Sequence, residues 1–199
     1  MPVTLKSVCL LFLVAAVRAA GQGAADSSFD APPKRIFVRP NVPAALFTSD
    51  KTALLEPECE RIAVYLARYA AEKYTAGVLR GEPEAMTKGR LLLAISLHLQ
   101  PMNGNAVQCA TRWLDGKEPT LPPPQENLRV FSNFLLSAAV RQMDKPAPAR
   151  EALSRILNRL AADLDPENED AIYASEIQDR DGKAPPLKEI LSGTLGSGW

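Results

Sequence analysis

The sequence predicts an all-α fold built from stacked helical hairpins, about six helices in all. The stretch Leu99-Gln-Pro101-Met-Asn103 returns 65 positions later as Leu164-Asp-Pro166-Glu-Asn168, in register and without a gap. Apolar residues recur at helical spacing in both copies, and no β-type alternation extends beyond a few residues. A helix-ending signal that repeats in register is typical of helical arrays, which present surfaces for partners.

Composition narrows the class of protein. The chain has 199 residues, no net charge and 46% apolar residues, which is enough for one sizeable core. A neutral chain with only 6% aromatic residues lacks both the basic surface and the stacking platform of a nucleic-acid binder. We therefore expect no nucleic-acid partner.

Residues 1–20 have the pattern of an export signal. Lys6 supplies the positive charge, residues 8–17 form a short apolar core, and small residues favour cleavage after Ala19 or Ala20. The apolar run is shorter than the roughly 20 residues of a spanning helix, so no integral membrane segment is expected in the mature chain. The pattern predicts export to the periplasm or cell envelope; a buried N-terminal helix is the alternative.

Residues 21–52 form a leader whose prolines disfavour helix, and the expected helical domain covers 53–182. Its first half, about 57–116, opens with a helix from Pro57 to Gly81. A second helix begins at Pro83 and ends before Pro101; because it is apolar nearly all round, we expect it to be a central layer. A third helix over 103–114 is expected to bury Val107, Ala110 and Leu114.

A proline-rich crossover at 117–124 separates this half from a second one over about 123–180. The second half repeats the apolar spacing on three further helices. Their apolar positions are Leu128, Phe131, Leu135 and Ala138, then Leu153, Ile156, Leu157, Leu160 and Leu164, then Ala171 and Ile172. Residues 183–199 are expected to be a flexible tail.

The Leu-x-Pro-x-Asn signal resembles the end of the second helix of a tetratricopeptide repeat, and the resemblance covers roughly residues 57–180. Gly77 and Gly89 stand where this family places small residues for close helix contact. Leu93 stands at a large apolar position, where the second half has Asn158.

The resemblance implies a right-handed α-superhelix whose concave groove binds a protein surface or an extended peptide. In this family the first helix of each hairpin faces inward, so exposed residues of the first and fourth helices are candidate partner-binding residues; a plain solvated helix face is the alternative. The candidates are Arg61, Tyr65, Arg68, Tyr74, Arg129 and Asn133.

Cys59 and Cys109 remain in the mature chain. In an oxidising compartment they form either one disulfide or two independent buried thiols, and the sequence leaves both options open. Burial in the core is the favoured interpretation of Trp113, with an exposed anchor as the alternative.

No catalytic, metal or cofactor site is expected. The sole histidine, His98, lies among leucines, and no GxSxG motif is present to expose a serine. The acidic run over 163–170 lacks the central glycine of an EF-hand and is better explained as helix-terminal charge. We expect a non-enzymatic interaction scaffold; the alternative is the helical regulatory part of an exported enzyme whose catalytic part lies on another or a downstream polypeptide.

Overall fold

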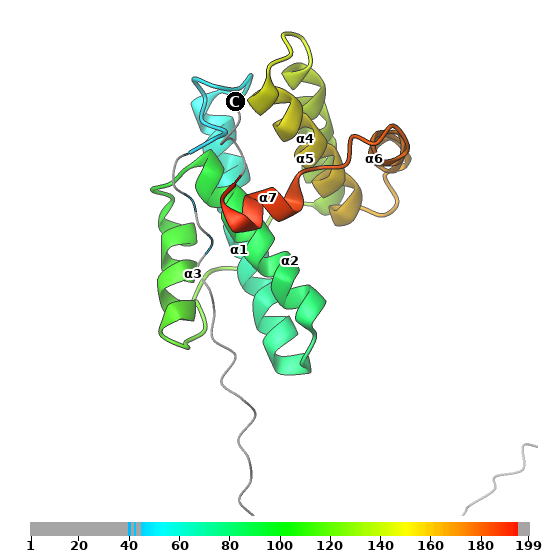
Figure 1. Ribbon diagram of the computed structural model, residues 1–199. Helices are drawn as coiled ribbons and strands as arrows, with labels where there is room; N and C mark the ends of the chain where they lie inside the picture. The colour runs from blue at the N-terminus through cyan, green and yellow to red at the C-terminus, as the bar shows by residue number, and fades with distance from the viewer. Residues whose placement is uncertain (1–39, 41, 43–44, 195–199) are drawn as a thin grey trace, which may run out of the picture. The chain divides into compact units, whose positions relative to one another are not determined.

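The computed structural model describes residues 40, 42 and 45–194, and these residues confirm the all-α prediction (Figure 1). They form seven helices and no strand. The helices are α1 Glu56–Arg80, α2 Pro83–Leu99, α3 Gly104–Leu114, α4 Leu128–Gln142, α5 Pro148–Leu164, α6 Glu169–Arg180 and α7 Leu187–Ser192. The expected signal peptide and most of the expected leader lie outside the described residues.

α1 and α2 form a close antiparallel hairpin. Gly81 ends α1 in the left-handed conformation, with φ of 69°, and Pro83 opens α2. A Cβ atom on Gly77 would lie 2.8 Å from the Met86 nitrogen, and one on Gly89 would lie 2.7 Å from the Tyr74 Cβ. The expectation that these two glycines allow close helix contact is therefore confirmed.

The 65-residue offset recurs in the helix bounds. α5 begins and ends 65 residues after α2, and α6 begins 65 residues after α3. At the corner before α3 the Asn103 side chain accepts a hydrogen bond from the Ala106 nitrogen, and Asn168 accepts one from the Ala171 nitrogen before α6. Each asparagine thus caps the helix that follows it.

α2 is the central helix of the first half, as predicted. It packs against α1, α3 and α7 (Figure 1), and all of its residues from Leu92 to Leu99 are buried. The prediction of which α3 residues are buried is partly wrong, because Val107 and Leu114 are exposed. The buried face consists of Ala106, Cys109, Ala110 and Trp113, since α3 turns its tryptophan toward α1.

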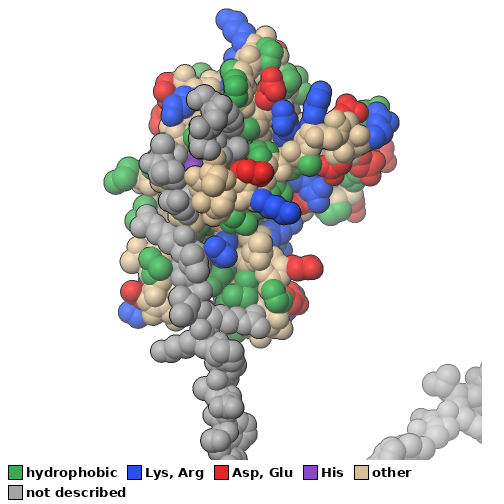
Figure 2. All heavy atoms as spheres, in the orientation of Figure 1, with side chains coloured by type: hydrophobic (Ala, Val, Ile, Leu, Met, Phe, Trp, Pro, Cys, Tyr) green, Lys and Arg blue, Asp and Glu red, His purple; other side chains and the backbone are tan. Residues whose placement is uncertain are grey.

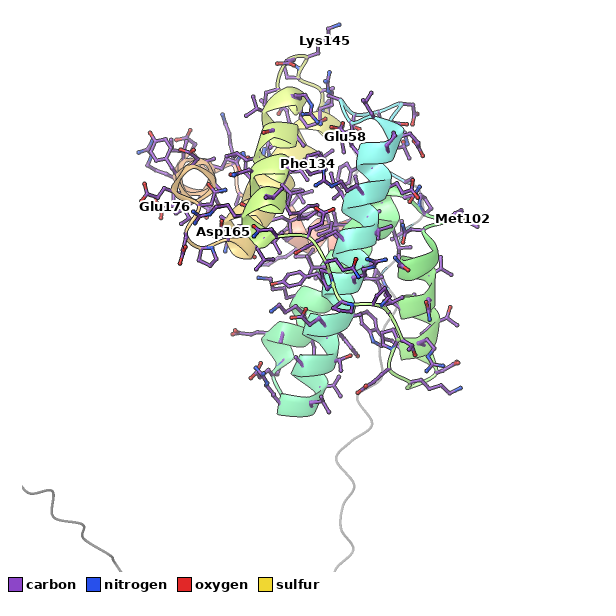
Figure 3. All side chains as sticks on the ribbon, turned by 180° about the vertical axis from the view of Figure 1, so that it is seen from behind. Glu58, Met102, Phe134, Lys145, Asp165 and Glu176 are labelled. Carbon is purple, nitrogen blue, oxygen red and sulfur yellow. The ribbon has the colours of Figure 1, made fainter. Side chains whose placement is uncertain are left out.

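Side chains from the two halves meet at several points. The rings of Tyr65 and Phe131 stack at 3.8 Å between centroids, and Lys88 pairs with Asp163 at 3.0 Å. The buried Gln142 side chain accepts a hydrogen bond from the Ala53 nitrogen at 2.8 Å. Figure 3 shows the facing sides of α1 and α4, with Glu58 on one helix and Phe134 on the other.

The segments flanking the helical domain also contribute to the core. Phe47, in the expected leader, is fully buried; its nitrogen donates to the His98 carbonyl at 3.1 Å and its ring lies edge-on to the imidazole. In the expected tail, α7 packs on α2 and buries Ile190. Among the helices of the described residues, none has the length and apolar character needed to cross a membrane.

Candidate binding groove

A groove of about 350 Å³ runs between α1 and the segment that precedes α4. The segment crosses α1 on its way from α3 to α4 (Figure 3). We call this feature the α1 groove; it is lined by Pro57, Glu60, Arg61, Val64, Tyr65 and Arg68 of α1 and by Pro124, Gln125 and Glu126 of the crossing segment. Three of the six candidate residues, Arg61, Tyr65 and Arg68, meet here because their spacing of four and three places them on one helix face.

Arg61 joins the two walls of the α1 groove. Its Nε and one terminal nitrogen bind both carboxylate oxygens of Glu126, at 3.0 and 2.9 Å, and its guanidinium lies 4.3 Å from the centre of the Phe134 ring. The hydrogen bond to Glu126 raises the pKa of Arg61. A two-pronged pair of this kind fixes geometry as well as charge. Arg61 therefore shapes the groove and has its charge already balanced.

Tyr65 forms the floor of the α1 groove. Its ring is 3% exposed and stacks on Phe131, so the prediction that Tyr65 is an exposed residue is wrong. Its hydroxyl is buried and has no hydrogen-bond partner among the described residues. Burial raises the pKa of Tyr65 to about 12, with further contributions from Tyr69, Glu126 and Glu72. The hydroxyl thus stays protonated and can both donate and accept.

Arg68 is the cation of the α1 groove that remains available. Its side chain is half-buried, its Nε is buried without a hydrogen-bond partner, and no ion pair joins it to the described part of the chain. Val64, Pro57 and Pro124 supply apolar surface nearby. The groove therefore offers a guanidinium, a phenol and apolar walls side by side, which suits a peptide segment that carries a carboxylate.

The other candidate residues have different surroundings. Tyr74 is buried against Trp113, with ring centroids 4.3 Å apart, so its predicted exposure is wrong. The reason is that α3 packs on α1 at this point and covers the tyrosine. Trp113 itself is in the core, as favoured from the sequence.

Arg129 and Asn133 lie together at a second hollow, of about 380 Å³, next to the α5–α6 corner. Arg129 binds Asp165 at 3.0 Å and Glu167 at 3.2 Å, and these partners raise its pKa. Asn133 accepts a hydrogen bond from the Asn168 amide at 2.9 Å. In Figure 2 acidic side chains gather around α6, next to this corner. Both candidates thus hold the corner in place.

Cys59 and Cys109 are free thiols. Cys59 donates to the Phe47 carbonyl and Cys109 to the Ala67 carbonyl, so the candidate disulfide is not formed in this structure. Burial raises the pKa of Cys109 to about 12; burial and the neighbouring Glu56 and Glu58 raise that of Cys59 to about 11. Both are protonated near neutral pH and are poor nucleophiles.

The acidic run has structural partners within the described residues. Asp163 pairs with Lys88 and Arg159, and Asp165 also accepts from the Glu167 nitrogen at the turn. No group of three or more histidine, cysteine or acidic side chains in the described part of the chain is arranged to hold a metal ion. The buried His98 is packed against Phe47 in the core.

Sequence reasoning missed the second wall of the α1 groove, formed by Pro124, Gln125 and Glu126. The proline-rich composition indicated a stiff crossover, but nothing local shows which helix a crossover lies against. Compared with known proteins, the chain matches no family model, and no curated protein or solved structure shows significant similarity to it.

Proposed function

We propose that this protein is an exported interaction scaffold that binds an extended, acidic segment of another protein in the α1 groove. The observation that carries the proposal is the juxtaposition of Arg68, which has no ion pair within the described residues, with the unpartnered hydroxyl of Tyr65. A carboxylate of the partner would bind the Arg68 guanidinium, and a backbone group would use the Tyr65 hydroxyl.

The walls of the α1 groove are held in place before any partner arrives. The Arg61–Glu126 pair fixes the crossing segment, and the Tyr65–Phe131 stack fixes the floor. Proline at 124 further restricts the second wall. A site that is already ordered loses little conformational entropy on binding, and this supports capture of a flexible peptide.

Export and a repeat architecture are parts of the same proposal. The pattern of residues 1–20 supports export to the periplasm or cell envelope, although these residues lie outside the described part of the chain. The tetratricopeptide-like, right-handed superhelical arrangement is supported by the shared 65-residue offset of α2 and α5 and by the two asparagine caps.

Peptide selection tests the proposal without knowledge of the natural partner. A display library of random twelve-residue peptides is selected on the full chain, and the enriched peptides are measured by fluorescence anisotropy. We expect enrichment of sequences that contain Asp or Glu, and weaker binding as the salt concentration rises. The Arg68→Glu variant should bind them at least about tenfold more weakly, because it replaces an attraction by a repulsion.

The matched control is Arg80→Glu, which makes the same charge change on the same helix but outside the α1 groove. It should change the affinity less than about threefold, since an exposed charge at a distance is screened. The proposal fails if no peptide is enriched, or if the Arg68 and Arg80 variants bind the enriched peptides equally well.

A further inference from the structure

The second half of the chain contains an open slot that the first half fills with its own side chains. The slot lies between α4, α5 and α6, and its volume is about 450 Å³. We call it the α6 slot. Val140, Met143 and Ile177 provide apolar walls, and Asn158 and Gln178 provide amides. The charged residues Glu151, Arg155, Asp181 and Lys183 and the hydroxyl of Ser154 complete the lining.

The 65-residue offset shows what is missing from the slot. Gln178 corresponds to Trp113, Ala139 to Tyr74, and Asn158 to Leu93. In the first half each of these three residues is buried, and the Tyr74 and Trp113 rings lie 4.3 Å apart between α1 and α3. The second half therefore lacks both aromatic rings that join the equivalent pair of helices.

The third helix of each half also packs differently. α3 packs on both α1 and α2, whereas α6 packs mainly on α5 and only slightly on α4. α4 and α5 themselves remain in close contact, because the Ser154 hydroxyl donates to the Ala139 carbonyl at 3.0 Å. The space between α4 and α6 thus stays open while the hairpin beneath it is intact.

Two polar groups in the slot lack partners. The amide oxygens of Asn158 and Gln178 are buried and accept no hydrogen bond from the described residues. Asn158 is only 8% exposed and replaces the leucine that the first half has in this position. Burying an acceptor without a donor is unfavourable, so an occupant that carries an N–H group would be stabilised here.

We infer that the α6 slot binds a tryptophan side chain presented by a partner protein. The indole ring would take the place that Trp113 has in the first half, and its N–H would donate to an amide oxygen of Asn158 or Gln178. Met143 supplies a sulfur suited to contact with an aromatic ring. The inference rests on the proposed function only in that the partner is a protein; the slot and the α1 groove have no lining residue in common.

The probe for this test is N-acetyl-L-tryptophanamide, with N-acetyl-L-phenylalaninamide as the comparison, each titrated into the full chain and followed by saturation-transfer NMR. We expect the tryptophan probe to bind at least about fivefold more tightly, because only indole supplies the donor. The double variant Asn158→Leu with Gln178→Leu, which removes both candidate acceptors, should reduce this preference to less than about twofold. The exposed amide variant Gln108→Leu on α3 should leave it unchanged.

A second variant fills the slot with the aromatic ring that the first half has at the corresponding position. Gln178→Trp should abolish binding of the tryptophan probe. Equal binding of the two probes by the unmodified protein, or undiminished binding by Gln178→Trp, would overturn the inference. Arg68→Glu should leave the probe affinity unchanged, so failure of the α1 groove and failure of the α6 slot are separate results.

Discussion

Substitution of Gly89 by alanine tests the close contact between α1 and α2. The new Cβ would lie 2.7 Å from the Tyr74 Cβ, 2.9 Å from the Tyr74 nitrogen and 3.0 Å from the Ala70 carbonyl oxygen. Two of these atoms belong to the backbone of α1, so they cannot rotate away. The two helices must separate, or α2 must shift along α1.

Two opposing effects set the size of the change. Overpacking of a close contact costs about 1–3 kcal/mol, and contact with backbone places Gly89→Ala toward the upper end. Alanine also favours helix over glycine by about 1 kcal/mol. We expect a net loss of about 1.5 kcal/mol in the free energy of unfolding, which lowers the melting temperature of a chain of this size by about 3–6 °C.

Urea unfolding followed by circular dichroism measures this loss. The control is Gly104→Ala at the start of α3, where an added Cβ meets no atom within 4 Å. The control should be neutral or stabilising, since only the helix preference changes. The reasoning is refuted if Gly89→Ala is as stable as the unmodified protein or more stable, because helix preference alone would give that result.

Three further predictions concern buried groups. Gln142→Ala leaves the Ala53 nitrogen without its acceptor and should destabilise the protein by about 1–2 kcal/mol in urea unfolding, whereas the exposed Gln108→Ala should have no measurable effect. Iodoacetamide should alkylate Cys59 and Cys109 only once the protein is unfolded, and no reductant should be needed. A peptide map of the non-reduced protein that contains a Cys59–Cys109 disulfide would contradict this. Because burial raises the folded-state pKa of Cys109 to about 12, above its unfolded value, the stability that depends on the neutral thiol is complete below about pH 9 and is lost as the pH rises toward 12. Between pH 9 and 11 the urea concentration at the unfolding midpoint should fall less steeply with pH for Cys109→Ala than for the unmodified protein. The same pH dependence for both proteins would contradict a raised pKa of Cys109.

Features with local signals were predictable from the sequence. Pro83 and Pro101 bracket α2 because proline is suited to the first turn of a helix and stops the interior. The same signals, 65 residues later, give the bounds of α5. Gly77 and Gly89 marked the close helix contact because only a residue without a side chain fits between two backbones.

Features that depend on tertiary contacts were not predictable in this way. The exposure of Tyr74 depends on α3, which covers it with Trp113, and no residue near Tyr74 in the sequence indicates this. α7 is short and buries Ile190 only through its contact with α2. Similarly, the sequence indicated only the α1 wall of the α1 groove. The second wall depends on the contact between Glu126 and Arg61, which are 65 positions apart in the sequence.

The central claim is that Arg68 binds a carboxylate of the partner segment. A double-mutant cycle measures this contact directly: an enriched peptide and its Asp→Asn or Glu→Gln counterpart are each titrated with the unmodified protein and with Arg68→Ala. We predict that Arg68→Ala weakens binding of the acidic peptide at least about tenfold and that of the amide peptide less than about twofold. Equal losses for both peptides would contradict the claim, since they would show that Arg68 does not contact the carboxylate.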